Sequence, residues 1–426
     1  MNVLVIGGGG REHAIVWKLS QSRHVDKIYC APGNAGIVEL ADCIDINLND
    51  FEKLLDFVKY NWIDLTIVGP EEPLSKGIVD AFEREGRKVL GPNRTASQIE
   101  SSKVFSKDFM RRYGIPTSEY KVFTSYIQAE DYVRVKGTPL VIKADGLAGG
   151  KGVFVSETID DAISSLRLIM KERAFGEAGD RVVIEQFIHG EEASFMAFTD
   201  GTTIIPMVSS QDHKRVFDGD MGPNTGGMGA YSPAPVITTS LESVIMEKVM
   251  RQALRGFKAE GIKYKGVLYA GLMIKDGKPY VLEFNCRLGD PETQPVLTRL
   301  ETDLVEIASA IVEERLNDIS LKWKDEVSVC VVLASKGYPG KYEKGSTIKG
   351  LDDVKGIEDV MVFHAGTAFD NTDIVTSGGR VLGVTAEGKD IPDAREKAYS
   401  AIEKIHFNGM HFRKDIAQRA LERTAV

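Results

Sequence analysis

Residues 139–152 read PLVIKADGLAGGKG, an apolar strand that runs through Lys143 into a glycine-rich loop. The loop is not a P-loop, because its glycines are spaced one residue too closely and Gly152 follows Lys151 where a P-loop has Ser or Thr. A second strand, residues 152–156, comes next, where a P-loop would open a helix. A glycine loop between two strands is typical of a flexible flap whose amides fold over phosphates.

The lysine at the end of the first strand needs an anionic partner, because a buried unpaired charge is costly. The phosphates of a bound nucleotide would supply that partner. The alternative is a lysine on a strand edge that extends its amine into solvent. Since the glycine loop adjoins Lys143, we favour the phosphates.

A second polar pattern lies in residues 281–292, VLEFNCRLGDPE. Successive side chains of a strand face opposite ways, so Glu283, Asn285 and Arg287 share one face. The other face is apolar and is expected in the core: Leu282, Phe284 and Cys286. Mg²⁺ prefers oxygen ligands and bridges carboxylates to phosphate, while arginine holds phosphates or carboxylates through paired hydrogen bonds. A solvated strand face is the alternative, but the turn at 289–292 favours a metal and phosphate site.

Two further loops carry charge. Residues 185–192, EQFIHGEE, end a strand; in a nucleotide site such a segment serves the base and the ribose, although alone it also fits a solvated turn. Residues 210–235, SQDHKRVFDGDMGPNTGGMGAYSPAP, form a long glycine-rich loop of the kind that usually has a function. Its residues 212–215 could contact anionic or amine substrates. His213 is either a catalytic residue or a hydrogen-bonding loop residue.

The first hundred residues alternate strands with helices. Helical patterns separate four apolar runs, at residues 3–6, 27–31, 65–69 and 88–92. The helical patterns cover residues 11–20, 51–60 and 73–85. This alternation predicts βαβ units and a parallel sheet, in which ligands lie at the carboxyl ends of the strands. Glycine and proline turns occupy those ends, at residues 7–10, 32–34 and 69–71.

The stretch GGGGREH at 7–13 invites a dinucleotide-binding interpretation, but its spacing fails. The third glycine of that motif would fall on Glu12 or His13, and the second strand, ending at 29–31, offers no acidic residue for a ribose. A glycine turn at a helix N-terminus beside Arg11 still suits a phosphate. A tight turn alone is the alternative, and we favour phosphate binding.

The whole pattern predicts an α/β and α+β multidomain protein of 426 residues. We expect an N-terminal parallel α/β domain at 1–102, a central domain at 103–325 with a small lid at about 117–189, and a strand-rich α+β domain at 326–426. Helices are expected at 241–259, 303–315 and 394–405, and a hairpin at 271–287. C-terminal strands are expected at 327–335, 361–366 and 380–386.

Bulk properties exclude several classes of protein. The net charge of −9 argues against a broad nucleic-acid-binding face, which usually shows as a basic domain. No apolar stretch reaches the roughly 18 residues typical of a membrane helix, and the N-terminus looks like a core strand and not a signal peptide. The cysteines lie far apart, which favours reduced thiols in the cytoplasm: Cys30, Cys43, Cys286 and Cys330.

These motifs together resemble the ATP-grasp superfamily, through the lysine strand, the flap, the segment at 185–192 and the strand at 281–287. Further segments resemble the phosphoribosylamine–glycine ligase family within it: VIGGGGREHA, APGNAG, IVGPEEPL, SQDHKR, GPNTGGMGAYSPAP and RLGDPETQP. The similarity runs from Asn2 to HFRKDIAQRAL at 411–421, and RLGDPETQ is highly specific for the family.

The resemblance implies a reaction. The carboxylate of glycine would attack the γ-phosphate of ATP, and the resulting glycyl phosphate would react with the amine of 5-phosphoribosylamine to give glycinamide ribonucleotide, a step of de novo purine synthesis. ATP is then a substrate and Mg²⁺ or Mn²⁺ the cofactor. The partners would be small molecules only, with no nucleic acid or membrane, and we expect a monomer.

Carried over to this sequence, the resemblance implies a role for each matching residue. ATP would contact Lys103, Lys143, Gly146, Gly149, Gly150, Lys151, Gly152, Glu185, Phe187, Ile188 and Glu192. The metal would bind Glu283 and Asn285, and the residues nearest the chemistry would be Arg287, Asp212 and Lys214. The other substrates would contact Gly8, Gly9, Gly10, Arg11, Pro32, Gly33, Asn34, Gly69, Pro70, Glu71, Gly226, Gly227, Met228 and Asp290.

One departure from the wider superfamily concerns the metal. Many members carry a further acidic ligand on the neighbouring strand, but residues 267–274, VLYAGLMI, have no carboxylate, so we predict one well-fixed ion. Three rival functions stay open: another ATP-grasp ligase of purine synthesis that uses formate or bicarbonate, a nucleotide-dependent dehydrogenase, and a nucleotide sensor without turnover.

Overall fold

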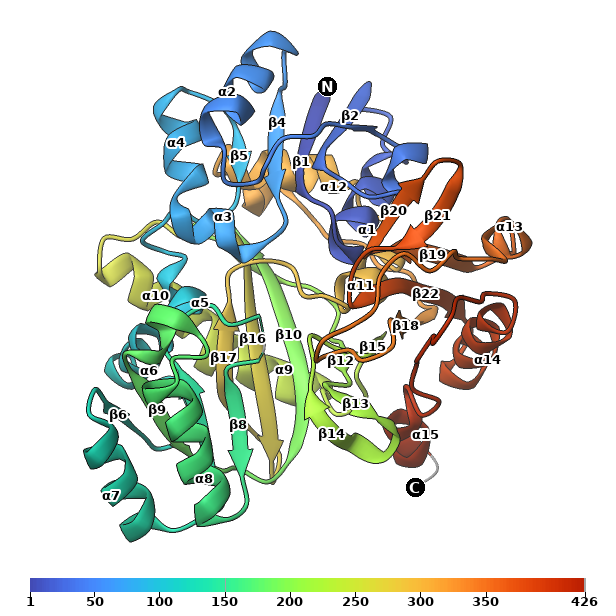
Figure 1. Ribbon diagram of the computed structural model, residues 1–426. Helices are drawn as coiled ribbons and strands as arrows, with labels where there is room; N and C mark the ends of the chain where they lie inside the picture. Colours follow the sequence, from blue (N-terminus) through green and yellow to red (C-terminus); the bar gives the residue numbers. More distant parts are fainter. Residues whose placement is uncertain (150, 425–426) are drawn as a thin grey trace.

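A five-stranded parallel sheet opens the chain in the computed structural model, which describes residues 1–149 and 151–424 (Figure 1). Its order is β3-β2-β1-β4-β5. The strands are β1 (Asn2–Gly7), β2 (Lys27–Pro32), β3 (Asp42–Cys43), β4 (Leu65–Val68) and β5 (Val89–Leu90). From β1 the chain adds β2 and β3 on one side of the sheet, and then adds β4 and β5 on the other side of β1. The direction in which strands are added therefore reverses between β1 and β4. Their carboxyl ends therefore border the crevice where such sheets bind ligands.

The helices of this part follow the predicted alternation with one correction. They are α1 (Gly10–Leu19), α2 (Phe51–Tyr60), α3 (Glu71–Lys76), α4 (Ile78–Arg84) and α5 (Gln98–Ser101). The expected single helix at 73–85 is two helices, because Gly77 adopts a left-handed conformation with φ of 91° between them. α3 consequently begins at the end of β4, with Glu71 in its first turn.

A small antiparallel sheet, ordered β6-β9-β7-β8, forms the lid at the lower left of Figure 1. Its elements are β6 (Tyr120–Phe123), α7 (Tyr126–Lys136), β7 (Leu140–Ala144), β8 (Val153–Ser156), α8 (Ile159–Leu166), a π-helical turn (Arg167–Lys171), a 3₁₀ turn (Gly176–Gly179) and β9 (Val182–Gln186). The flap joins β7 to β8, as predicted. α6 (Lys103–Arg112) leads into the lid from its N-cap Ser102, whose side chain accepts from the N–H of Phe105.

The central sheet, ordered β11-β10-β16-β17, runs through the middle of the molecule. Its strands are β10 (Glu191–Thr199), β11 (Ile204–Pro206), β16 (Gly266–Lys275) and β17 (Lys278–Asn285), with β16 and β17 forming the predicted hairpin. The helices packed here are α9 (Thr239–Ile245), a π-helical turn (Met246–Met250), α10 (Arg251–Ala259) and α12 (Leu304–Val312), while α11 (Thr293–Thr298) packs against α1 and the C-terminal sheet.

The C-terminal sheet, ordered β12-β15-β18-β22-β19, takes strands from both sides of residue 326. These are β12 (Gln211–Asp212), β15 (Gly229–Ser232), β18 (Val327–Ala334), β19 (Val360–His364) and β22 (Arg380–Gly388). The first two strands flank the long glycine-rich loop; β12 pairs with β15 and β15 pairs with β18, so this sheet anchors both ends of the loop. Remaining elements are a 3₁₀ turn (Leu316–Asp318), α13 (Leu351–Val354), β20 (Thr367–Asp370), β21 (Asp373–Thr376), α14 (Ile391–Ile402) and α15 (Gln418–Thr424).

The glycine-rich loop itself folds into a hairpin of β13 (Arg215–Phe217) and β14 (Met221–Asn224) that the C-terminal segment braces. Arg413, 1% exposed, donates to Asp220 (2.9 Å) and to both carboxylate oxygens of Asp415 (2.7 Å each). Asp415 in turn accepts from the N–H of Gly219 at 2.8 Å. The loop that the sequence left unstructured is therefore held by charge-assisted hydrogen bonds.

Two buried histidines join α1 to β19. The N–H of His364 donates to Nδ1 of His13 at 2.8 Å, and the two rings lie 5.6 Å apart. Burial, reinforced by the neighbouring His364, lowers the pKa of His13 to about 3, and burial lowers the pKa of His364 to about 4. This contact fixes the parallel sheet against the C-terminal sheet.

Among the residues described, no helix is long and apolar enough to cross a membrane.

This pair predicts a loss of stability in acid. The pKa of His13 is about 3 in the folded chain against 6.5 when unfolded, so between these values the unfolded state binds more protons and stability falls as the pH drops below 6.5. His13→Asn keeps an acceptor and removes the titration. Between pH 7.5 and pH 5 we expect it to lose less stability than the wild type does, by roughly 2 kcal/mol.

Thermal unfolding at both pH values measures the difference. His406→Asn, at an exposed position, is the matched control and should follow the wild type. An equal loss of stability in wild type and His13→Asn would show that the buried pair does not carry the acid sensitivity.

Candidate functional site

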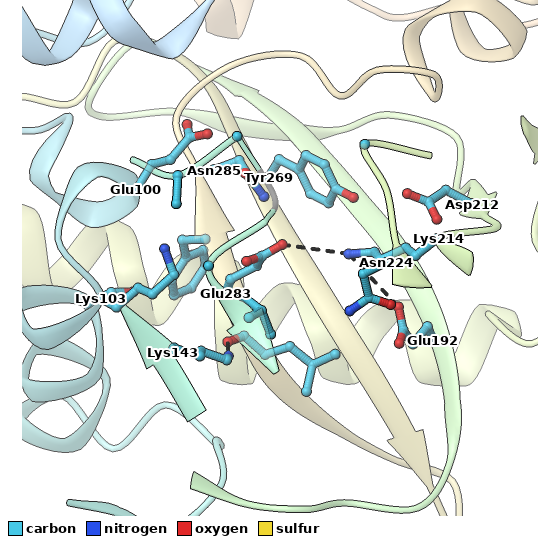
Figure 2. A pocket seen from close by; sticks show the side chains of 18 of the residues that line it. Glu100, Lys103, Lys143, Glu192, Asp212, Lys214, Asn224, Tyr269, Glu283 and Asn285 are labelled. Atoms are coloured by element: carbon cyan, nitrogen blue, oxygen red, sulfur yellow. Dashed lines mark hydrogen bonds and ion pairs between the residues drawn. The ribbon is translucent and has the colours of Figure 1, made fainter. Parts of the chain in front are cut away.

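One cavity of about 420 Å³ lies where the parallel sheet, the lid, the central sheet and the C-terminal sheet meet (Figure 2). Each part contributes side chains to its lining, among them Arg11, Glu71, Lys103, Lys143, Glu283 and Arg380. The flap and the polar strand singled out in the sequence therefore face the same space.

Lys143, at the end of β7, has two partners within the protein. Its Nζ lies 2.8 Å from Oε1 of Glu185 and donates to the carbonyl oxygen of Leu282 at 2.9 Å. The anion beside Lys143 is thus a side chain, although the sequence suggested phosphates alone. On its other side Glu185 lies 2.7 Å from Nζ of Lys107. Burial alone would raise the pKa of Glu185, but the two lysines lower it to about 2.

The flap closes one wall of the cavity. Lys103 donates to the carbonyl oxygen of Gly146 at 3.0 Å and lines the cavity together with Leu147, Ala148, Gly149 and Gly152. Gly149 has φ of 55°, a conformation that favours glycine. Lys151 is exposed, and Gly150, also expected to contact ATP, lies outside the described residues.

The segment after β9 lines the cavity next to the flap. Phe187 and Ile188 reach it, and Glu192 at the start of β10 lies with its Oε2 3.8 Å from Nζ of Lys214. Glu185, expected beside the base, also lines the cavity, and its carboxylate lies between the two lysines. Phe187 packs edge-on against His189, with ring centroids 4.7 Å apart.

The polar row of β17 faces the cavity, with one correction. Glu283 and Asn285 line it, and Phe284 and Cys286 belong to the core as expected. Leu282 was expected on the core face but borders the cavity, because a β-bulge opposite Gly271 and Leu272 shifts the alternation by one residue.

The carboxylate of Glu283 is ionised. Burial would raise its pKa, but Lys214, Lys143 and Lys103 lower it to about 2. Nζ of Lys214 lies 3.5 Å away (Figure 2). A carboxylate and an amide oxygen in one row, Glu283 and Asn285, are hard oxygen donors of the kind that a magnesium ion takes.

Arg287, just beyond β17, is held by two carboxylates of the N-terminal part. Its Nε lies 2.8 Å from Glu71 at the start of α3, and its Nη2 lies 2.8 Å from Glu100 in α5. Glu100 also accepts from the N–H of Cys286 at 2.7 Å. The two acidic residues raise the pKa of Arg287 further despite burial, so the guanidinium is a fixed charge at the cavity wall.

The end of β12 and the residues just after it supply a buried acid, Asp212, and a cation, Lys214. Asp212 lies 8% exposed, and its Oδ1 has no hydrogen-bond partner among the described residues. Burial raises the pKa of Asp212 well above its usual value. Lys214 lies between Glu283 and Glu192, which raise its pKa against the effect of burial. Tyr269 and Glu292, hydrogen-bonded to each other, line the same wall.

Other loop residues diverge from expectation. Met228 lies in a core cluster with Val216 and Ala334, so its side chain belongs to the packing under the loop. His213 is 1% exposed, and burial together with Arg413 lowers its pKa to about 3. The backbone of His213 donates to the carbonyl oxygen of Gly229 (2.9 Å) and accepts from the N–H of Met228 (2.8 Å), while neither ring nitrogen has a hydrogen-bond partner in the described part of the chain.

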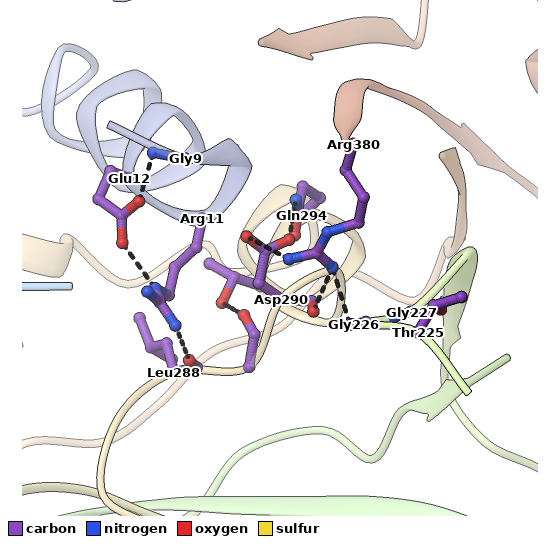
Figure 3. A network of polar contacts seen from close by, with 12 residues as sticks. Gly9, Arg11, Glu12, Thr225, Gly226, Gly227, Leu288, Asp290, Gln294 and Arg380 are labelled. Carbon is purple, nitrogen blue, oxygen red and sulfur yellow. Dashed lines mark hydrogen bonds and ion pairs between the residues drawn. The ribbon is translucent and has the colours of Figure 1, made fainter. Parts of the chain in front are cut away.

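Figure 3 shows how the C-terminal sheet reaches the cavity through Arg380. Its Nη1 donates to the carbonyl oxygens of Gly226 (2.8 Å) and Asp290 (2.7 Å), and its Nη2 lies 3.3 Å from the carboxylate of Asp290. Asp290 also accepts from Gln294 at 3.1 Å. The predicted residues Gly226 and Asp290 are thereby fixed by one arginine that the sequence did not single out.

In the turn after β1, one backbone amide is hydrogen-bonded to a side chain of α1, the helix that follows the turn. The N–H of Gly9 donates to Oε2 of Glu12 at 2.6 Å, and Glu12 pairs with Arg11 at 2.7 Å (Figure 3). Arg11 lines the cavity and donates to the carbonyl oxygen of Leu288 at 3.0 Å. Gly10 packs against the side chains of Gln294 and Asp290. A carboxylate thus binds one amide of this turn in the place expected for phosphate.

The other two turns lie beside it. Asn34 donates to the carbonyl oxygens of Gly8 (2.9 Å) and His364 (2.8 Å), so it joins the first turn to β19. Gly33 packs under Gly8, and Pro32 is exposed. After β4, Gly69 packs against Glu12, while Pro70 and Glu71 line the cavity.

Several residues of the site had not been singled out in the sequence. They are Lys107, Glu100, Arg380, Tyr269, Glu292 and Asn224. Lys107 carried a usable signal, since it lies one helical turn after Lys103 on α6 and so shares a face with it. The others have no local pattern that separates them from ordinary surface or core residues.

Three family models match the chain in order. The phosphoribosylglycinamide synthetase N domain matches residues 1–100, its ATP-grasp (A) domain residues 101–293 and its C domain residues 328–419. A phosphoribosylamine–glycine ligase of Caldanaerobacter subterraneus is 53% identical over 417 residues, which cover 98% of this chain and 99% of that protein.

Solved structures agree on the fold. The crystal structure of phosphoribosylamine–glycine ligase from Thermotoga maritima matches with a TM-score of 0.86 and 35% identity, over 98% of this chain and all of that one, 100%. A biotin carboxylase domain of Hydrogenobacter thermophilus 2-oxoglutarate carboxylase, in complex with MgADP, matches with a TM-score of 0.74 at 17% identity, over 96% and 91% of the two chains. The expected ATP-grasp fold is confirmed.

Gly227 allows the loop to approach the Asp290 turn. Its φ of 116° favours glycine, and a Cβ there would overlap Cδ of Pro291. We expect Gly227→Ala to push the loop away from this turn and to lower kcat by roughly 100-fold. Steady-state kinetics with all substrates measure the effect.

Gly219→Ala is the matched control. Gly219 lies on the hairpin of the same loop, has φ of 65° and has open space around a Cβ, so it carries the backbone strain without the overlap. Equal effects of the two substitutions on kcat would contradict the proposed close approach.

Proposed function

The chain belongs to the phosphoribosylglycinamide synthetase family of ATP-grasp proteins, and we propose that its central cavity joins glycine to 5-phosphoribosylamine with ATP. It is an ATP-dependent ligase that forms a carbon–nitrogen bond, and its reaction is a step of purine biosynthesis. The observation that supports this best is the meeting of a lysine-lined flap, an acidic strand and the crevice of the parallel sheet in one cavity.

The first step activates glycine. An oxygen of its carboxylate attacks the γ-phosphorus of ATP, the bond to the β-phosphate oxygen breaks, and ADP leaves with the electron pair. We assign Lys103 and Lys143, with the flap from Gly146 to Gly152, to the ATP phosphates. Phe187, Ile188 and Glu192 would receive the base and ribose. These groups act by positioning the reactants and stabilising charge that develops on the phosphoryl oxygens.

The second step forms the amide. The amine of 5-phosphoribosylamine attacks the carbonyl carbon of glycyl phosphate, the carbon–oxygen bond to phosphate breaks, and the proton lost by the amine passes to the departing phosphate. Arg287 and Lys214 are the cations next to the acyl phosphate in this assignment. Asp212, a buried carboxylate in need of a cation, suits the ammonium group of glycine. The closed flap keeps water from the intermediate.

The sugar phosphate is assigned to the turns at the switch point of the parallel sheet. Arg11, Pro70 and Glu71 border the cavity there, and Gly8–Gly10, Pro32–Asn34 and Gly69 lie beside them. Gly226, Gly227 and Asp290 close the opposite side. Because Arg287 contacts Glu71, the amine end of this substrate would lie next to the activated carboxylate.

Members of the ATP-grasp fold use divalent metal ions, and the residues present fit one. Glu283, ionised, and Asn285 offer oxygen atoms in one row of β17, and we propose Mg²⁺, or Mn²⁺ in its place. A bound ion there would neutralise phosphate charge and orient the γ-phosphoryl group.

We also propose a monomeric cytoplasmic enzyme with small-molecule partners and neither nucleic-acid nor membrane binding. The net charge of −9 and the four free thiols support it. The division of the chain at residues 102 and 325 is part of the same proposal.

ADP release tests the reaction directly. ATP and Mg²⁺ are supplied with glycine and with phosphoribosylamine, made in situ from ribose 5-phosphate and ammonia, singly and together. We expect stoichiometric ADP release only with both. Release with another carboxylate in place of glycine would keep the mechanism and overturn the substrate.

Removal of one metal ligand tests the acidic strand. Glu283→Gln keeps the shape but removes the charge, so we expect kcat at saturating Mg²⁺ to fall by roughly 100-fold and Mn²⁺ binding with ATP, followed by electron paramagnetic resonance, to weaken. Glu247→Gln, at an exposed ion pair on a distant helix, is the control. Near-normal kcat and Mn²⁺ binding in Glu283→Gln would sink the metal assignment.

A further inference from the structure

A chain of three buried charges lies behind the flap: Lys107, Glu185 and Lys143. The carboxylate of Glu185 lies 2.7 Å from Nζ of Lys107 and 2.8 Å from Nζ of Lys143, one oxygen to each. The side chains are 2%, 2% and 6% exposed, respectively. All three border the cavity, but the reaction assigned above gives a role to Lys143 and none to Lys107.

The hydrogen bonds of the two lysines differ in one respect. An ammonium group has three N–H donors. Lys107 donates two hydrogen bonds, to Thr117 (2.7 Å) and to Ser118 (3.0 Å), beside its ion pair with Glu185. Lys143 donates one, to the carbonyl oxygen of Leu282, beside its own ion pair with Glu185. Lys143 therefore keeps more of its donors for a ligand than Lys107 does.

Charge balance explains why a second lysine is present. A single lysine beside Glu185 would form a neutral pair, and two lysines leave one positive charge in excess in a buried site. Ser118 supports this arrangement by donating to Glu185 at 2.7 Å. Other charges face the same region: Lys103 adds to the positive charge, and Glu283 and Asp145 oppose it. An excess cation in low dielectric is costly until an anion arrives.

We propose that Lys107 is a positioning residue that neutralises Glu185, so that Lys143 stays free to bind the phosphates of ATP. The inference rests on the proposed function, because it takes those phosphates to lie at Lys143. Lys107 touches no substrate in this account. It acts through Glu185, which holds Lys143 in place and would otherwise cancel its charge.

Charge-balanced variants separate this role from a merely structural one. Lys107→Met removes a charge and leaves Glu185 paired with Lys143 alone, so we expect binding of MgATP, without glycine or the amine, to weaken about tenfold. Lys107→Met with Glu185→Gln restores one positive charge, so this double variant should regain most of the lost affinity. If Lys107 only supported the structure, the double variant should bind MgATP more weakly than Lys107→Met, because the effects of two buried defects add.

Isothermal titration calorimetry with MgATP and with AMP gives the dissociation constants. AMP lacks the β- and γ-phosphates, so its binding should change much less in Lys107→Met than that of ATP. Lys59→Met, which removes the same charge from an exposed ion pair with Glu85, should leave both unchanged. Thermal unfolding verifies that each variant is folded.

The outcomes are distinct. Loss of ATP affinity in Lys107→Met with recovery in the double variant supports the inference. Unchanged ATP binding in Lys107→Met, equal losses for ATP and AMP, or a double variant weaker than the single one would overturn it. Lack of MgATP binding by the wild type would overturn the proposed function, and the inference with it.

Discussion

The ion pairs of Arg287 with Glu71 and Glu100 hold the site together. They join the end of β17 to the crevice of the parallel sheet, two parts whose strands belong to different sheets. Because these groups are largely buried, breaking one pair would leave a charge without compensation. The distance between the acidic strand and the turns of the parallel sheet is therefore fixed by chemistry at the place where a carboxylate and an amine have to meet. From the C-terminal sheet, Arg380 holds the loop at Gly226 and the turn at Asp290 in place on another side of the cavity.

The cavity as a whole gathers charges that a folded chain ordinarily keeps apart. Lys103, Lys143 and Lys214 converge on Glu283, and each is buried or partly buried. Their mutual arrangement keeps the carboxylate ionised and leaves positive charge facing the flap. Such preorganisation suits phosphoryl transfer, in which the protein contributes position and electrostatics more than covalent chemistry.

Much of this was readable in the sequence where local patterns are strong. The period-two row of Glu283, Asn285 and Arg287, the flap after Lys143 and the parallel alternation of the first hundred residues predicted their elements correctly. The bulge that turns Leu282 toward the cavity and the helix break at Gly77 were missed. Each is made by a single residue, which leaves the pattern of apolar and polar residues in the segment almost unchanged. The roles of the individual residues stay predictions.

Long-range partners were beyond the sequence. Glu185 pairs with Lys107 and Lys143, but nothing in EQFIHGEE distinguishes a carboxylate that faces two lysines from one that faces a base. Arg380 and Asp290 lie ninety residues apart along the chain and meet only through the fold. The family resemblance placed Met228 near a substrate, and its apolar side chain packs into the core under the loop.

The central claim is that ATP activates the carboxylate of glycine as an acyl phosphate in this cavity. Glycine labelled with ¹⁸O in both carboxylate oxygens tests it most directly, with mass analysis of the inorganic phosphate released in a complete reaction with ATP, Mg²⁺ and phosphoribosylamine. The account predicts one ¹⁸O atom in each phosphate, because the bridging oxygen comes from glycine and leaves with phosphorus. Phosphate without ¹⁸O, formed together with the amide product, would contradict it.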